Sequence, residues 1–175
     1  DNSTKFYELF KDGKEKGKEE IIDAWMKAHL EESTRTITKA MDQYEPYVAT
    51  RELALLIENL SQWYVRRVRD RVRDGDAVAI ATLRETLHTI ARLIAPFSPF
   101  IAEEVYQAVK DKKDPDSVHL ASWPSVPFRL MSKNKQLISE MELVRNTASY
   151  FLKLRQQKGI VVRQPLASLS TRASF

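Results

Sequence analysis

The residues best suited to chemistry lie in one stretch, Ser61–Asp76, which reads SQWYVRRVRDRVRDGD. Five arginines fall in the eight residues from Arg66 to Arg73, directly after a tryptophan–tyrosine pair. Guanidinium groups bind phosphates through paired hydrogen bonds and stack on planar groups, and aromatic rings stack on unpaired bases. Asp70 and Asp74 dilute this positive charge but do not cancel it. The stretch is therefore a candidate RNA-binding surface.

The candidate nucleic-acid-binding residues are Gln62, Trp63, Tyr64, Arg66, Arg67, Arg69, Arg71 and Arg73. The arginines would neutralise phosphates, which is a sequence-independent contribution to binding. The aromatic pair and the glutamine would contact unpaired bases. A purely structural interpretation stays open, because charge runs are usually solvated helix faces and an aromatic pair often belongs to a core.

Two of these arginines conflict with the helix that should carry them. At about 100° per residue, Arg67 and Arg71 fall on the face that is core in the first half of the helix. That face contains Leu53, Leu60 and Tyr64. An unpaired arginine in a core is very costly. Either the helix runs past the end of the core, or these arginines pair with buried carboxylates from another helix.

No catalytic centre is expected in this chain. The three histidines are far apart in sequence, and neighbouring glutamates point about 100° apart on a helix, so neither set forms a metal site or an acid–base pair. There is no cysteine and no glycine-rich phosphate loop. The sequence predicts no catalytic residue, no metal site and no bound cofactor.

The composition is typical of a globular protein, with 43% hydrophobic and 30% charged residues. A net charge of +4 is too small to argue for nucleic acid without the local arginine cluster. No apolar run is long enough to span a membrane, and no signal peptide is expected. Because the chain begins at Asp1, we expect either a processed protein or a piece of a longer one.

Long amphipathic stretches with few glycines predict an all-α antiparallel bundle of four to five helices. The expected helices span residues 18–41, 48–73, 76–95, 100–109 and 132–158. An extended excursion with three prolines, residues 111–129, surrounds Trp123. We expect a connector at 1–17, one helical domain at 18–158 and a tail at 159–175, in which IVVRQPL begins like a short strand.

Several segments, in the same order along the chain, resemble isoleucyl-tRNA synthetases, which are class Ia enzymes. They are NLSQWYVRRVRDR (59–71), TIARLIAPFSPFIAEEVYQ (89–107), DSVHLASWP (116–124) and VRQPL (162–166). APFSPFIAEE alone is shared with valyl and leucyl enzymes, whereas WYVRR together with the last two segments favours isoleucine. The likeness covers about residues 20 to 167.

The resemblance implies a helical anticodon-binding domain that holds the anticodon stem-loop of tRNA-Ile. It also implies an upstream Rossmann catalytic domain in cis, which would bind ATP and Mg²⁺, and a monomeric, cytoplasmic protein. The run after Arg67 is shorter than in the family and contains aspartates, which favours Arg66 and Arg67 as tRNA contacts. Two alternatives remain: the same domain of a valyl or leucyl enzyme, and a non-catalytic helical module that binds an acidic protein.

Overall fold

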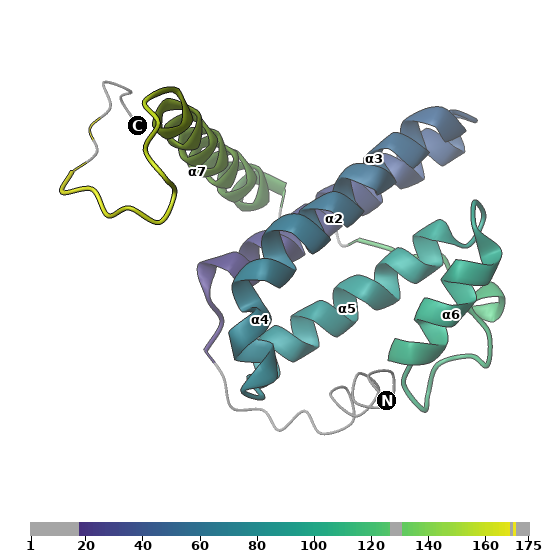
Figure 1. Cartoon of the computed structure of the whole chain (residues 1–175). Coiled ribbons are helices and arrows are strands. Elements are labelled where there is room, and N and C mark those ends of the chain that lie inside the picture. Colours follow the sequence, from purple (N-terminus) through teal and green to yellow (C-terminus); the bar gives the residue numbers. More distant parts are fainter. Residues whose placement is uncertain (1–17, 127–130, 169, 171–175) are drawn as a thin grey trace. The chain divides into compact units, whose positions relative to one another are not determined.

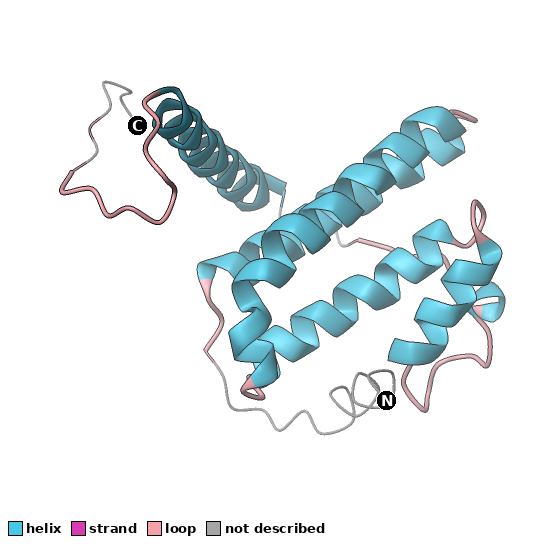
Figure 2. Ribbon diagram, viewed as in Figure 1, coloured by secondary structure: helices cyan, strands magenta, loops and turns pink. Residues whose placement is uncertain are grey.

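The computed structural model describes residues 18–126, 131–168 and 170, and these residues form helices joined by loops, with no strand among them (Figure 2). The prediction of an all-α fold is therefore confirmed. The connector predicted at 1–17 lies outside the described residues. The chain divides into two compact units, Asp1–Ile138 and Ser139–Phe175. This division falls inside the predicted 18–158 domain.

The first unit is built from long helices that reverse direction at tight turns (Figure 1). Along the chain they are α2 (Ile21–Asp42), α3 (Pro46–Glu58), the π-helical segment η1 (Asn59–Tyr64), α4 (Val65–Arg73), α5 (Ala77–Ile94), α6 (Pro99–Val109) and the short 3₁₀ helix η2 (Val118–Leu120). α3, η1 and α4 follow one another without a break. α2 packs against α3 and α5, and α5 packs against α6.

The core of this unit lies where α2, the α3–η1–α4 helix and α5 meet. Its largest fully buried apolar or aromatic side chains include Met26, Ile37, Leu56, Tyr64, Val68 and Leu93. A smaller cluster around Tyr106 and Val118 joins α6 to the proline-rich excursion. There the carboxylate of Glu103 accepts hydrogen bonds from the hydroxyl of Ser117 and the backbone N–H of Val118, both at 2.9 Å. The excursion is therefore held against the helices.

One turn joins α4 to α5 and fixes the end of the arginine-rich helix. Gly75 has φ +83°, a left-handed conformation that glycine adopts without steric cost. The N–H of Asp76 then bonds the carbonyl of Arg71 at 2.9 Å, closing the helix end. The Asp76 side chain accepts hydrogen bonds from the N–H groups of Val78 and Ala79 at 3.0 and 3.1 Å and so caps α5.

The turn after α2 has the same backbone pattern, but a tyrosine stands where glycine is usual. Tyr44 has φ +57°, and the N–H of Glu45 bonds the carbonyl of Ala40 at 2.9 Å. The left-handed conformation costs an L-residue about 1–2 kcal/mol. The side chain of Tyr44 is 92% exposed, so its packing contacts offset little of this conformational cost.

We expect Tyr44→Gly to raise the free energy of unfolding by about 1 kcal/mol, because glycine removes the steric penalty at this turn. Urea denaturation checks this result. Tyr47→Ala is the matched control, since Tyr47 is also exposed but lies within α3, and its effect should stay within about 0.5 kcal/mol. A Tyr44→Gly protein no more stable than the wild type would contradict the strain argument.

The second unit contains the later part of α7 (Met131–Gln157) and the tail that follows it. The tail forms turns and bends, so the expectation of a short strand in IVVRQPL is wrong. The Arg155 guanidinium donates hydrogen bonds to the carbonyls of Val161, Val162 and Gln164 at 2.6, 3.0 and 2.5 Å. These contacts curl the tail around one side chain, whereas a strand would leave successive carbonyls pointing to alternate sides.

Candidate nucleic-acid interface

The π-helical segment η1 sets which side chains of α4 face the core. The N–H of Val65 bonds the carbonyl of Leu60, five residues earlier. An α-helix has 3.6 residues per turn, so a row spaced by four residues drifts around its axis. A π turn closes its hydrogen bond between residues that are five apart instead of four, so it accommodates one residue more than an α turn. As a result Leu60, Tyr64 and Val68 are all buried, although each is four residues from the next.

This register resolves the conflict at Arg67. A uniform 100° helical wheel places Arg67 on the core face, but Val68 occupies that position and the Arg67 side chain is exposed. The placement predicted from the wheel is wrong because it assumes an α-helix throughout. The Arg67 guanidinium carbon lies 3.0 Å from the centroid of the Trp63 ring, and its Nη1 donates to the Trp63 carbonyl at 3.2 Å.

The exposed cations of α4 form what we call the arginine surface, consisting of Arg66, Arg67, Arg69 and Arg73. Among the described residues no carboxylate forms an ion pair with Arg66 or Arg69. Arg73 is partly neutralised by Asp70 at 2.9 Å and Asp74 at 3.3 Å. The strongest positive charge therefore lies toward the start of α4.

The other candidates from the sequence are placed differently. Gln62 is exposed, and Trp63 is half-buried with Arg67 over one ring face. Tyr64 is fully buried, so its ring has no face open to a base. The Arg71 side chain is only 18% exposed. The structure thus brings Gln62 and Trp63 next to the arginine surface and places Tyr64 and Arg71 inside the fold.

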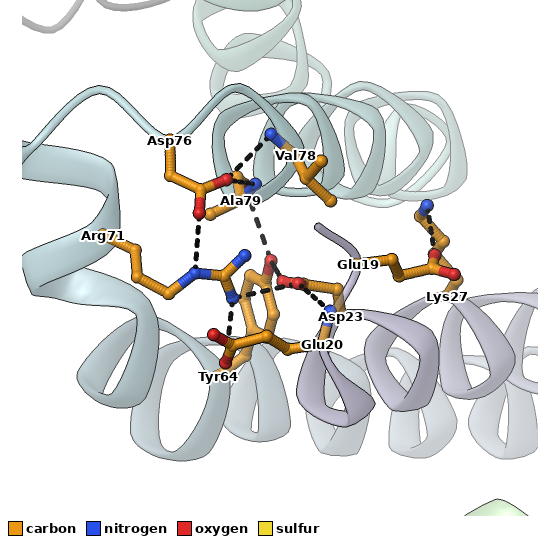
Figure 3. Close-up of polar contacts among 9 residues, drawn as sticks. All are labelled: Glu19, Glu20, Asp23, Lys27, Tyr64, Arg71, Asp76, Val78 and Ala79. Carbon is orange, nitrogen blue, oxygen red and sulfur yellow. Dashed lines mark hydrogen bonds and ion pairs between the residues drawn. The ribbon is translucent and has the colours of Figure 1, made fainter. Parts of the chain in front are cut away.

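Tyr64 and Arg71 belong to a polar network that joins the starts of α2 and α5 to α4 (Figure 3). The Tyr64 hydroxyl donates to Asp23 Oδ1 at 2.8 Å. Arg71 Nη1 lies 2.9 Å from Asp23 Oδ2 and 3.4 Å from Glu20 Oε2, and Arg71 Nε donates to Asp76 Oδ2 at 3.0 Å. For Arg71, pairing with carboxylates from another helix is therefore the correct explanation.

The network fixes the charge state of its members. Burial, followed by the hydrogen bond to Asp23, raises the pKa of Tyr64, which keeps the phenol neutral. Burial lowers the pKa of Arg71, but hydrogen bonds to Asp76 and Asp23 outweigh that effect and raise it overall. Burial likewise raises the pKa of Asp76, whereas the hydrogen bonds from Arg71 and the α5 backbone lower it overall. Arg71 and Asp76 therefore stay oppositely charged and hold α4 against α5.

The lowered pKa of Asp76 gives a pH-dependent prediction. A carboxyl whose folded-state pKa is below its ordinary 3.8 stabilises the fold above that value, and the contribution is lost as pH falls through the folded-state pKa. Asp76→Asn keeps a good helix cap but removes the charge. We expect the wild type to lose more free energy of unfolding than Asp76→Asn between about pH 5 and pH 2. Parallel urea-unfolding curves over that range would contradict this role.

Sequence reasoning did not name Asp23 and Glu20 as the partners of Arg71. A signal was present, because Asp23 interrupts the apolar pattern formed by Ile22, Trp25 and Met26. Asp23 is fully buried although its side chain is a carboxyl group. A carboxylate on the core face of one helix and an arginine on the core face of another are candidates for a buried pair.

In the part of the chain that the structure describes, no group of three or more histidine, aspartate or glutamate side chains could hold a metal ion. No helix within the described ranges is long and apolar enough to cross a bilayer.

Comparison with known proteins places this arrangement in a family. The family model described as "Anticodon-binding domain of tRNA ligase" matches residues 23–170. The chain belongs to that family. This is the domain class that the segments carrying the sequence resemblance predicted.

Several similar relatives are isoleucine–tRNA ligases. The isoleucine–tRNA ligases of Streptomyces avermitilis and Thermobifida fusca are 37% and 39% identical over 150 and 152 residues, covering 84% of this chain. Isoleucine–tRNA ligase 2 of Bacillus cereus is 37% identical over 153 residues, covering 85% of the chain. In each case the match covers only 14% of the relative's length.

Proposed function

We propose that this chain binds the anticodon stem-loop of tRNA-Ile as one domain of an isoleucine–tRNA ligase. Its membership of the anticodon-binding family and the names of its relatives support this function. The observation that carries the proposal is the arginine surface, in which Arg66 and Arg69 have no ion-paired carboxylate among the described residues. Such a surface attracts the phosphates of a folded RNA.

In this proposal the arginines and the polar network have separate roles. Arg66, Arg67 and Arg69 bind backbone phosphates, which sets the position of the stem-loop and makes binding salt-dependent. Gln62 and Trp63 lie beside them as candidates for contacts with unpaired bases. Tyr64 and Arg71 do not touch RNA but hold α4 in place, so the arginine surface is preorganised.

The chemical step belongs to another part of the longer protein. We propose a Rossmann catalytic domain upstream in cis, which would bind ATP and Mg²⁺ and acylate the tRNA. The residues of this chain would bind and orient the tRNA through the arginine surface. We further propose that the whole enzyme is monomeric and acts in the cytoplasm.

The test is binding of the 175-residue chain to tRNA-Ile, tRNA-Val and tRNA-Leu across a salt series. Tighter binding to tRNA-Ile supports the proposal. A preference for tRNA-Val or tRNA-Leu would assign the domain to the corresponding ligase instead. Binding to these tRNAs no tighter than to an acidic polypeptide of matched charge would overturn the proposal and favour an acidic protein partner.

A further inference from the structure

A pocket of about 210 Å³ lies at the far end of α5 from the arginine surface. One wall is the last turn of α5 with the link that follows it, and the other is the excursion around η2. The side chains that could recognise a ligand are Arg92, His119, Ser122 and Trp123. None of the lining residues is acidic.

Arg92 carries a positive charge that makes only weak contacts within the fold, among the residues that the structure describes. Its guanidinium makes only long hydrogen bonds, both of 3.4 Å, to the His88 carbonyl and the Thr89 hydroxyl within α5. Among the described residues no carboxylate forms an ion pair with it. Asp114, which lies 3.1 Å from His88 Nε2, attracts Arg92 only at longer range. A half-buried arginine without a directly contacting carboxylate is a place where a ligand's anion would be bound.

Trp123 supplies a rigid aromatic surface beside that charge. Its indole N–H donates to the Thr38 hydroxyl of α2 at 2.9 Å, and the side chain is 36% exposed. The excursion that carries it is held in place by Glu103 through Ser117 and Val118. The ring therefore loses little conformational entropy when a planar group stacks on it.

We propose that this pocket holds one unpaired nucleotide of the bound RNA, with its base against Trp123 and its phosphate at Arg92. The pocket is smaller than the roughly 300–1,000 Å³ of sites for drug-sized ligands, so it suits a single unit of a polymer. An aromatic ring with a guanidinium is the usual combination for an unstacked base in RNA. This inference rests on the proposed RNA-binding function.

The site would complement the arginine surface rather than extend it. Asp76 caps α5 next to Arg71, and Arg92 lies sixteen residues further along the same helix, about 24 Å at 1.5 Å per residue. At the arginine end Tyr64 is buried and Arg67 covers a face of Trp63. The two ends of α5 would thus contact different parts of the RNA: the arginine surface would bind mainly the backbone of the stem-loop, and the pocket would bind one unpaired nucleotide.

The test compares two RNAs: a hairpin with the anticodon stem-loop of tRNA-Ile, and a blunt duplex with the same stem sequence. Trp123→Ala and Arg92→Gln should each weaken hairpin binding on the order of tenfold and leave duplex binding unchanged, because a paired base cannot enter the pocket. Arg92→Gln should also lower the salt slope for the hairpin by about one. Trp123→Phe, which keeps an aromatic ring, should retain most of the binding.

Lys112→Ala is the matched control, since it removes an exposed positive charge from the same excursion outside the pocket lining. Circular dichroism and thermal unfolding identify variants that fail to fold, and Arg92→Gln and Trp123→Phe keep the test decisive if Trp123→Ala is one of them. Hairpin binding unchanged in Arg92→Gln, or equal losses for hairpin and duplex, would overturn the inference. A wild-type chain that binds neither RNA would instead overturn the proposed function.

Discussion

Replacing Asp23 by alanine should lower the free energy of unfolding by about 3 kcal/mol. Asp23 is fully buried and accepts a hydrogen bond from Tyr64 while pairing with Arg71. Its removal leaves a mostly buried guanidinium without its inner partner, and breaking a buried pair in this way costs about 3–5 kcal/mol. We expect the lower end of that range because Arg71 keeps its contact with Asp76. Urea denaturation monitored by circular dichroism measures the loss.

The matched control is Glu19→Ala, which removes a carboxylate from the residue preceding the α2 cap. Glu19 is paired with Lys27 at 2.8 Å, but both side chains are well exposed. Exposed pairs of this kind contribute about 0.2–1 kcal/mol. If Asp23→Ala were no more destabilising than Glu19→Ala, the polar network of Figure 3 would not be what holds α4 in place.

The double substitution Arg66→Ala with Arg67→Ala should weaken tRNA binding by about tenfold or more at moderate salt. Each phosphate contact that is lost should also reduce the salt slope by about one, so the double variant should lose about two. Both side chains are exposed, so the fold should be retained. Filter binding or fluorescence anisotropy over a salt series gives both quantities at once.

A variant with the same change in net charge separates local contacts from overall attraction. Lys112→Ala with Lys113→Ala removes two exposed positive charges from the excursion, away from α4. This control should lower affinity slightly and leave the salt slope near the wild-type value. An equal effect from the two double variants would mean that the arginine surface is not a defined phosphate site.

Much of the fold could be predicted from the sequence because the signals that start and stop its helices are local. Gly75 and Asp76 mark the turn between α4 and α5 by their own conformational and hydrogen-bonding preferences. The expected helix at 76–95 accordingly agrees with α5 to within about one residue. The resemblance in the segments 59–71 and 89–107 then indicated the family that the comparison confirmed.

The details of the candidate site depend on information that is not local. A helical wheel assumes one angle per residue, and only the observed π segment shows that Val68 replaces Arg67 on the core face. The partner of Arg71 is Asp23, which lies on another helix and comes close only after the chain folds. By residue type Tyr64 is a candidate for base stacking, but the packing of the helices buries its ring completely.

The π segment also determines how α3 to α4 can change during evolution. Ser61 is exposed within it, so most substitutions there should be tolerated. Deleting that one residue would convert the π turn into an ordinary α turn, because the π turn holds one residue more than an α turn. On a uniform wheel Val68 would then stay on the core face and Arg67 would stay exposed. Homologous genes should therefore vary at this position both in the identity of the residue and by the loss of a single codon.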